Sequence, residues 1–527
     1  MPFVSKFRST LFRTTLGASA GLLAGFTALA VAEMVAGLIR PAAGPVTVVG
    51  GAVIDRTPAA VKDFAIRSFG ENDKTVLQLG ILAVLALIAA ALGALGLRHR
   101  RTGSCGVLVF GLIGATAALS RPDSQGIGDI LPSLFGAVAG ASVLYVLVGR
   151  ASGAPTTGDS TNGGGWNRRG FLVAAGVTAV GATSAGLLGR YLTGRSAQDA
   201  VASRQGLVLP APASPAPPVP RAAQLRVPGI TPFTTANKDF YRVDTALVVP
   251  KVDAGTWRLR IHGKGVSRPR TFNLDDLLAR PLIERDITLT CVSNEVGGPY
   301  AGNARWLGVR LSDLLAECGV KPPSAGGGAD QLVARSVDGM TLGSPVEDVM
   351  DGRDAILAVG MNGDPLPFDH GFPVRMVVPG LFGYVSACKW IEDIELTTFD
   401  AYDPYWVKRK WARRAPIKTQ SRIDTPKPFA RPAAGIVTVA GVAWAQRRGI
   451  TRVQIRVDDG PWQDADLAAQ DTVDTWRQWS YRWQATPGGH NITVRATDGT
   501  GQAQPEQRTR TIPDGASGWH SVFVTVT

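Results

Sequence analysis

Residues 286–309, DITLTCVSNEVGGPYAGNARWLGV, place a cysteine where its side chain could do chemistry. A run rich in β-branched residues predicts a buried strand that ends at Cys291, and a polar, glycine-rich turn follows directly. A lone buried cysteine usually packs as a small hydrophobic residue. A strand end beside a polar, glycine-rich turn also suits a residue with a chemical role. Cys291 is therefore either a packing residue or a residue that takes part in chemistry.

The other cysteines have no such setting. The chain holds four, with no CxxC pair and no regular spacing, so neither a disulfide framework nor a zinc or iron-sulfur site is indicated. Cys105 falls in an apolar segment and Cys318 in a predicted short helix, which favours packing for both. None of the five histidines lies in an apolar segment, so we expect no haem held by two histidines within a membrane. Electrons would pass to a separate partner.

Apolar segments are concentrated before residue 193. Five of them are long enough to cross a bilayer, which takes about 20 apolar residues. The flanking arginines predict a cytoplasmic N-terminus and a return to the cytoplasm at Arg150, so residues 1–150 should form four transmembrane helices. Glu33, inside the first segment, is either a functional carboxylate or a side chain that reaches the interface. The segments are residues 15–39, 75–97, 104–120, 128–149 and 170–192.

A polar linker over residues 151–169 ends in NRRGFL, where Arg168 and Arg169 precede the fifth apolar segment. The pair resembles a twin-arginine export signal in mid-chain, and the alternative is two arginines that hold the loop in the cytoplasm. Export would place everything after about residue 193 on the outer face of the cell membrane.

Three further regions follow the fifth segment. Residues 193–230 are rich in Pro and Ala and predict an extended, semi-rigid spacer. Residues 231–425 mix strands with short helices, of which two should begin at the N-caps Asn273 and Ser312. Residues 426–527 show short alternating strands with regular turns, typical of an immunoglobulin-like β-sandwich. The fold class is thus a multi-pass α-helical membrane region, an α+β domain and a C-terminal sandwich.

Four stretches within residues 231–527 together resemble the sulfite oxidase family of molybdopterin enzymes, in its exported, membrane-anchored form of actinobacterial type. The resemblance implies an α+β molybdopterin domain followed by an immunoglobulin-like domain. It also implies that Cys291 is a molybdenum ligand beside the two sulfurs of the pterin. The stretches are FYRVDTALVVPKVDAGTWRLRIHG, LTCVSNEVGG with ARWLGVRLSDLL, LAVGMNGDPLPFDHGFPVRMVVPGLFGYVSACKWIEDIEL, and GWHSVFVTV.

The resemblance also implies a cofactor pocket for molybdenum-molybdopterin, whose phosphate needs cations and backbone N–H groups. Cys388 would lie beside the cofactor and contribute its backbone. Each side chain, taken singly, also has an ordinary structural interpretation as a turn histidine or a strand-end charge. The implied cofactor-binding residues are Tyr241, Arg242, His370, Arg375, Ser386 and Lys389.

The implied substrate residues depart from the family's pattern. Where sulfite oxidases have an Asn-Arg-Arg type sequence after the ligand cysteine, this chain has Ser293, Asn294 and Glu295. Trp411 stands where the family has a catalytic tyrosine, and an indole lacks the proton-donor chemistry of a phenol. Arg448 matches a substrate arginine of the second domain, or is an exposed strand-end charge. Arg242 is also expected to face the metal.

The sequence therefore predicts an oxidoreductase that transfers an oxygen atom to or from a small oxyanion or oxide, by sulfite oxidation or S- or N-oxide reduction. A cytochrome or a quinone-linked protein would be the electron partner, membrane lipid would surround the helices, and the sandwich would pair two copies as a homodimer. The net charge of +13 reflects arginines beside apolar segments, so we expect no nucleic-acid binding. The alternative function is a membrane transport or sensor module whose outer domain binds a ligand without catalysis.

Overall fold

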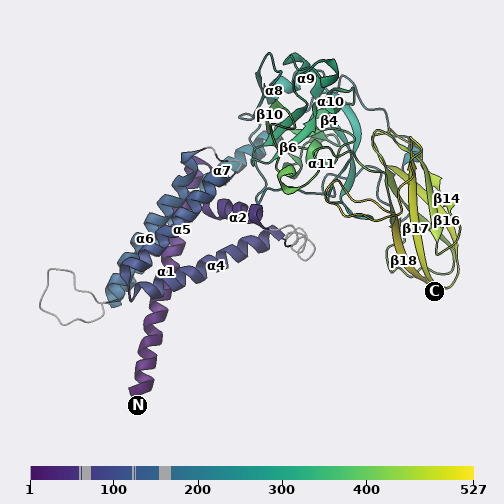
Figure 1. Ribbon diagram of the computed structural model, residues 1–527. Coiled ribbons are helices and arrows are strands. Elements are labelled where there is room, and N and C mark those ends of the chain that lie inside the picture. Colours follow the sequence, from purple (N-terminus) through teal and green to yellow (C-terminus); the bar gives the residue numbers. More distant parts are fainter. Residues whose placement is uncertain (1, 58–60, 62–72, 122–123, 125, 153–167) are drawn as a thin grey trace, which may run out of the picture. The chain divides into compact units, whose positions relative to one another are not determined.

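The computed structural model describes residues 2–527 except 58–60, 62–72, 122–123, 125 and 153–167 (Figure 1). The chain divides into two compact units. The first comprises Met1–Asp199 with Ala246–Val249, and the second comprises Ala200–Thr245 with Pro250–Thr527.

The first unit is helical. Five of its described helices are long and apolar enough to cross a membrane. The short apolar helix α2 was not predicted from the sequence. It begins with Pro45, a residue that is favoured at the first position of a helix. The helices are α1 (Pro2–Ile39), α2 (Pro45–Arg56), α4 (Asp73–Gly96), α5 (Arg100–Ser120), α6 (Leu131–Ala151) and α7 (Arg168–Gln205).

Small residues let these helices approach closely. A Cβ atom at Gly21 of α1 would lie 1.9 Å from the carbonyl oxygen of Ala89 on α4. A Cβ atom at Gly136 of α6 would lie 2.4 Å from the carbonyl oxygen of Ala28 on α1. Such contacts are typical of helices that associate within lipid, where close backbone packing replaces the hydrophobic driving force.

Helix α7 is longer than the predicted fifth segment. It begins at Arg168, and the rest of the predicted linker, residues 153–167, lies outside the described residues. Its last turn belongs to the second unit, where the Arg204 guanidinium donates to the carbonyl oxygens of Leu366 (2.7 Å) and Pro365 (2.8 Å). The start of the predicted spacer is therefore helical and fixed.

The Pro/Ala-rich segment is extended, but it differs from a free spacer because it lies along the second unit. Ser214 forms a parallel β-bridge with Ile283, and the N–H group of Ala216 donates to Glu284 Oε2 at 3.2 Å. The Arg285 guanidinium donates to the Ser214 carbonyl oxygen at 3.1 Å. The composition correctly predicted an extended backbone. It did not predict that the segment would lie along β3.

Residues 250–419 of the second unit contain two sheets that share one apolar core around Trp306, Leu259 and Ile261. One sheet has the order β2-β1-β10-β5-β6, and the other has the order β3-β4-β7-β8 with β9 paired to β7. The first is built from β1 (Arg258–Gly263), β2 (Arg270–Asn273), β5 (Gln331–Ser336), β6 (Thr341–Pro345) and β10 (Ile391–Thr397). The second is built from β3 (Ile283–Thr290), β4 (Ala301–Arg310), β7 (Ile356–Met361), β8 (Asp364–Pro365) and β9 (Arg375–Val377).

Four short helices connect these strands: α8 (Leu274–Leu278), α9 (Leu311–Glu317), α10 (Val346–Met350) and α11 (Gly383–Ser386). Asn273 caps α8 in a reciprocal capping box with Asp276, which confirms the predicted N-cap. The predicted helix α9 is present, but its predicted N-cap, Ser312, was wrong, because the helix begins at Leu311 and its N-cap residue is Arg310, without a side-chain hydrogen bond.

The C-terminal residues form two four-stranded antiparallel sheets, ordered β11-β12-β16-β15 and β14-β13-β17-β18. Their facing side chains, among them Val439, Trp479, Ile455 and Val494, form a second apolar core. The immunoglobulin-like class stays a prediction. The strands, drawn in yellow tones in Figure 1, are β11 (Gln420–Thr425), β12 (Gly435–Trp444), β13 (Ile450–Val457), β14 (Gln463–Asp464), β15 (Asp466–Leu467), β16 (Arg477–Ala485), β17 (Gly488–Asp498) and β18 (His520–Val526).

Candidate functional site

Cys291 lies directly after β3, where the strand turns back into β4. Its N–H group donates to the Tyr300 carbonyl oxygen at 2.9 Å, which extends the β3-β4 ladder by one pair. The chain then turns, because the Asn294 N–H group donates to the Cys291 carbonyl oxygen at 3.0 Å and the Asn294 side chain accepts from the Tyr300 N–H group at 2.7 Å. Cys291 is only 8% exposed, so the turn holds its thiol in a sheltered, defined position.

The environment of the Cys291 sulfur favours the neutral thiol over the thiolate. Burial raises the pKa of the thiol, while a hydrogen bond from the Ser293 N–H group at 3.4 Å and the positive charge of Lys389 act in the opposite direction. The net effect is a raised pKa, which keeps the thiol neutral in the absence of a metal. A metal ion at the sulfur would displace this proton, as thiolate ligation requires.

Arg375 on β9 is a buried cation beside this cysteine region. Arg375 is 5% exposed. Its Nη1 donates to the His370 carbonyl oxygen at 3.2 Å, and its guanidinium lies 4.8 Å from the ring centroid of Trp306. Its Nε atom is buried without a hydrogen-bond partner, and no carboxylate among the described residues pairs with it. Burial lowers the pKa of Arg375 to about 10.

His370 closes the short 3-10 helix Phe368–His370 and is likewise buried. Its Nε2 lies 3.0 Å from the Asn237 carbonyl oxygen, so Nε2 carries the proton and donates it. Burial, followed by the charge of Arg375, lowers the pKa of His370 to about 4. The ring is therefore neutral at pH 7.

Lys389 and Arg242 share a carboxylate at the edge of the same region. The Lys389 Nζ atom donates to Asp244 Oδ2 at 2.7 Å, and Arg242 Nε contacts the same oxygen at 3.0 Å. Arg242 also pairs with Asp369 at 3.1 Å. Tyr241 precedes Arg242 and stacks on Phe240 with ring centroids 5.2 Å apart. Two cations thus meet two acids here, unlike the situation of Arg375.

The described fold brings five of the predicted cofactor and ligand residues into one electrostatic group. Burial and the nearby Cys291 thiolate raise the pKa of Tyr241, and Arg375 lowers it. The charge of Lys389 acts on Cys291 and on His370. Arg375 lies on β9, Lys389 follows α11 and Cys291 follows β3. The group therefore joins segments that are far apart in the sequence.

Two buried donors in this region have no protein partner among the described residues: Arg375 Nε and Asn294 Nδ2. Leaving a buried donor unsatisfied costs about 1–3 kcal/mol, and more for a charged group. An anionic, acceptor-rich group that binds beside the cysteine would satisfy such donors. The residues present therefore fit a molybdopterin with its phosphate and pterin heteroatoms.

Ser386 and Cys388 already have hydrogen-bond partners within the protein, which the resemblance does not imply. The Ser386 hydroxyl donates to the carbonyl oxygens of Leu381 (3.0 Å) and Phe382 (3.1 Å), in the segment that leads into α11. Cys388 is buried, and burial raises the pKa of its thiol. Its carbonyl oxygen accepts from the Met376 N–H group at 2.8 Å, so its backbone is committed to β9.

Arg448 and Trp411 have structural partners of their own. Arg448 Nε pairs with Asp498 Oδ2 at 2.8 Å, and Nη2 donates to the Ile417 carbonyl oxygen at 2.9 Å. Trp411 packs against Tyr384 and Trp406. Within the described residues, the polar contacts of Arg448 do not reach the Cys291 group, so its role as a substrate residue stays a prediction.

Sequence reasoning missed the acids that neutralise Arg242, although Asp244 lies two residues away in the same motif. It also missed Gln446 from the β12-β13 loop. The Gln446 side chain is fully buried and donates to the Thr288 carbonyl oxygen at 2.8 Å, three residues before Cys291. A lone glutamine in a loop carries no sequence signal for that contact.

Comparison with known proteins agrees with this geometry. Residues 246–406 match the family model described as "Oxidoreductase molybdopterin binding domain", and residues 416–527 match "Mo-co oxidoreductase dimerisation domain". The fold and site thus define a molybdopterin-binding oxidoreductase.

The relatives place the chain within one family of that class. It is 30% identical to sulfite oxidase from Gallus gallus over 321 residues, which covers 52% of this chain and 68% of that protein. It is also 30% identical to mitochondrial sulfite oxidase from Mus musculus over 344 residues, 56% of this chain and 62% of that protein's length. The sulfane dehydrogenase SoxCD from Paracoccus pantotrophus covers 53% of this chain at 26% identity, with a TM-score of 0.45. The chain belongs to the sulfite oxidase family.

Proposed function

We propose that this chain catalyses two-electron oxygen-atom transfer on a small substrate, with molybdenum-molybdopterin as its cofactor. One observation carries the proposal: Arg375 is a buried cation with an unpaired Nε, and it lies in the same electrostatic group as the sheltered thiol of Cys291. A fold without a bound anion gains nothing from such an arrangement.

Each residue of the group has a role that follows from its surroundings. Cys291 is the thiolate ligand, fixed by its backbone pairing with Tyr300. Arg375 and Lys389 bind the anionic part of the cofactor, and the protonated Nε2 of His370 stays committed to Asn237 while its other nitrogen can accept. The cofactor, when bound, supplies the two-electron exchange of an oxygen atom, and the protein orients it and excludes competing reactions.

The substrate side favours a neutral molecule. Arg448, the implied substrate arginine, pairs with Asp498, and Arg242, which is expected to face the metal, pairs with two aspartates. The exposed turn after Cys291 adds a further carboxylate, Glu295. A dianion would meet little free positive charge, so reduction of a neutral S- or N-oxide is the first candidate reaction. Sulfite oxidation is the second, and it is favoured by the sulfite oxidases among the relatives.

Paired assays distinguish these reactions. The purified holoenzyme is supplied either with a reduced viologen dye and methionine sulfoxide or trimethylamine N-oxide, or with sulfite and ferricyanide. We expect turnover of an oxide at a rate that exceeds the sulfite rate. Turnover of sulfite alone would reverse the order of the two candidates, and turnover of neither by a protein without molybdenum would favour a transport or sensor module.

The proposal extends to location. Five apolar helices in the N-terminal region, with Arg168 and Arg169 before the last of them, support a multi-pass membrane protein whose catalytic part is exported by a twin-arginine route. Replacing both arginines with lysine should leave the catalytic part in the cytoplasm, protected from protease added to intact cells. Digestion of that variant from outside would contradict the export proposal.

Two partners follow from the same reasoning. The match of residues 416–527 to a dimerisation domain supports a homodimer. A cytochrome or a quinone-linked protein in the same membrane would exchange electrons with the molybdenum site. Light scattering of the detergent-solubilised protein tests the dimer, and a mass of one chain plus detergent would contradict it.

A further inference from the structure

The turn that follows Cys291 is held by the C-terminal domain. Arg422 on β11 is 8% exposed, and its Nη1 donates to the Gly298 carbonyl oxygen at 2.9 Å. Its Nε pairs with the buried Asp424 at 2.7 Å, which fixes the guanidinium in place. Asp424 in turn accepts from the Thr231 N–H group at 3.0 Å. The contact with Gly298 is therefore part of a rigid network and not a solvent-exposed pair.

His520, the first residue of β18, touches the adjacent residue of the same turn. Its Nδ1 accepts from the Ile423 N–H group at 3.0 Å, so the ring is oriented by β11. The other edge of the ring lies so close to Gly297 that a Cβ atom there would be 2.2 Å from His520 Nε2. Gly297 also has φ of 80°, a conformation that suits glycine. Imidazole and turn are thus in direct contact, with no room for another side chain.

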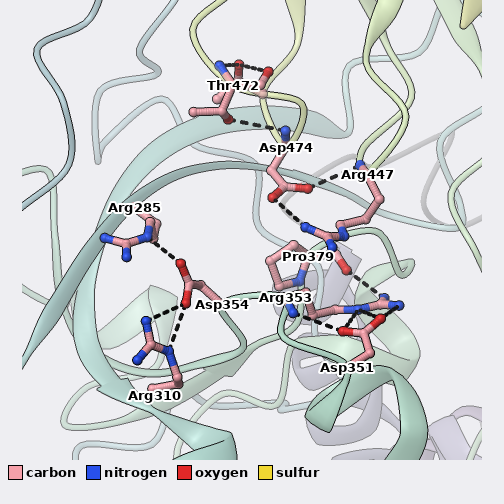
Figure 2. A network of polar contacts seen from close by, with 10 residues as sticks. Arg285, Arg310, Asp351, Arg353, Asp354, Pro379, Arg447, Thr472 and Asp474 are labelled. Atoms are coloured by element: carbon pink, nitrogen blue, oxygen red, sulfur yellow. Dashed lines mark hydrogen bonds and ion pairs between the residues drawn. The ribbon is translucent and has the colours of Figure 1, made fainter. Parts of the chain in front are cut away.

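The same domain also holds the strand that leads into Cys291. The Thr288 N–H group donates to the Asp474 carbonyl oxygen at 3.0 Å, and the Trp476 N–H group donates to Thr288 Oγ1 at 2.8 Å. Figure 2 shows the Asp474 side chain facing Arg447, whose N–H group donates to Asp474 Oδ1 at 3.1 Å. The edge of β3 near Thr288 is therefore closed by residues of the C-terminal domain, whereas Ser214 pairs with the start of the strand at Ile283.

These contacts bracket Cys291 on both sides of the sequence, at Thr288 before it and at Gly297 and Gly298 after it. The backbone pairing of Cys291 with Tyr300 and the hydrogen bonds of Asn294 hold the near side of the turn, and the contacts from β11 and β18 hold its far side. The strands that carry Arg422 and His520 contribute Ile423 and Val522 to the second apolar core, whereas Trp444 and Trp476 of the same domain lie in the core beneath β3. The second domain can therefore act on the position of the sulfur both through the turn and through the packing beneath β3.

We propose that Arg422 and His520 are positioning residues that set the orientation of the Cys291 thiolate toward the metal. The inference rests on the proposed molybdopterin chemistry of the same site. It assigns the C-terminal domain a part in the reaction that does not require Arg448 to reach the substrate. A displacement of about 1 Å at a reacting centre can lower turnover by up to about 100-fold, so a modest shift of the turn is measurable.

The test compares three variants of the full-length holoenzyme. His520→Asn keeps an acceptor for the Ile423 N–H group and removes the ring edge that touches Gly297. Arg422→Lys keeps a positive charge beside Asp424 and loses the paired contacts with Gly298 and Thr231. His490→Asn is the matched control, because His490 on β17 pairs with Asp458, which follows β13, and the described contacts of its side chain lie within the C-terminal sheets.

Four quantities are measured: molybdenum and pterin content, the sulfur-to-molybdenum absorption band with the Mo(V) EPR signal, kcat and KM, and thermal unfolding. We expect His520→Asn and Arg422→Lys to keep molybdenum and pterin within about twofold of the wild type while the spectra shift. We expect kcat to fall about tenfold with little change in KM. His490→Asn should match the wild type in all of them.

The inference is overturned if both variants keep wild-type spectra and kcat, or change no more than His490→Asn does. If His520→Asn fails to fold, Arg422→Lys alone decides by the same criteria. A wild-type protein without molybdenum would instead overturn the proposed function, and this inference with it, so the two failures are distinguishable.

Discussion

Arg375 and Arg448 are two arginines of the same unit with opposite surroundings. Arg448 pairs with Asp498, a carboxylate that is fully buried and also accepts from Thr419 at 2.8 Å. Arg375 contacts a carbonyl oxygen and an aromatic face, and it has no carboxylate partner among the described residues. A cation that is already neutralised stabilises the fold, whereas a buried cation without an acid destabilises it until an anion binds. The difference supports the proposal that Arg375 is the cation that binds the cofactor.

Arg242 lies between these two cases. It contacts Asp244 and Asp369, yet its side chain is 35% exposed and its partner Asp244 also serves Lys389. Charge is therefore balanced at the outer edge of the site and unbalanced inside it. A cofactor phosphate would complete the balance on the inside.

The largest expected effect comes from Arg375→Met. The substitution removes the anion-binding cation but also removes a buried, unpaired charge from the metal-free protein. We expect pterin content to fall steeply, since truncating a buried charge partner costs roughly 2–5 kcal/mol of binding. The metal-free protein should unfold at the same or a higher temperature than wild type.

Pterin fluorescence after denaturation and differential scanning calorimetry measure the two quantities. Arg375→Lys is the matched control, and it should retain part of the pterin because a point charge remains without the planar fork. Full pterin content in Arg375→Met would contradict the assignment of this side chain.

Arg448→Met should show the reverse pattern. Asp498 would stay buried without its cation, although Thr419 and Thr500 would continue to donate to it. We expect the free energy of unfolding to fall by about 1–3 kcal/mol, with pterin content unchanged. Chemical denaturation and pterin fluorescence check both parts. Loss of substrate affinity in a variant of wild-type stability would restore Arg448 as a substrate residue.

A smaller, pH-dependent effect is expected from His520 on the domain that holds the cysteine turn. Burial and the charges of Arg508 and Arg422 lower the pKa of His520 to about 4, and Asp424 opposes them. Between this value and the ordinary pKa of histidine near 6.5, the unfolded chain binds the proton and the folded chain does not. Stability contributed by the neutral ring is therefore present above about pH 6.5 and lost as the pH falls toward 4.

The measurement is the free energy of unfolding of wild type and His520→Asn at several pH values. The wild type should lose about 1–2 kcal/mol more than the variant between pH 7 and pH 4.5, given about 1.4 kcal/mol per pKa unit and some solvent screening. Parallel pH profiles for the two proteins would show that the ring titrates normally.

Ser386→Ala gives the smallest expected effect. The hydroxyl already donates to two carbonyl oxygens just before its helix and is fully buried. We expect a loss of about 1 kcal/mol of stability and wild-type pterin content, because only a local hydrogen bond disappears. A pronounced loss of pterin would show instead that the hydroxyl turns toward the cofactor.

Much of the architecture was predictable because it rests on local signals. Hydrophobic length located five candidate spans, the Asn273 capping box fixed a helix start, and alternating residues located most strands of the C-terminal sheets. The start of α9 was not predicted correctly. Its N-cap residue makes no side-chain hydrogen bond, and the sequence signal for an N-cap points to Ser312, one position inside the helix.

The site was predictable in its members and not in its balance of charge. Cys291, His370, Arg375 and Lys389 lie in matched segments, so their types and order were visible. Whether an arginine meets a carboxylate depends on contacts across the fold, such as the pairing of Arg448 with a residue 50 positions away. The packing of the Pro/Ala-rich segment against β3 could not be predicted for the same reason. Composition indicates that a segment is stiff, but it does not indicate which surface the segment contacts.

The most direct test of the account is molybdenum and pterin analysis of wild type and Cys291→Ser purified side by side. The account predicts molybdenum and pterin near one per chain in the wild type. In the variant it predicts retained pterin, because Arg375 and Lys389 are intact, together with loss of activity and of the sulfur-to-molybdenum absorption band. A wild type without molybdenum, or a variant with the wild-type band and rate, would contradict it.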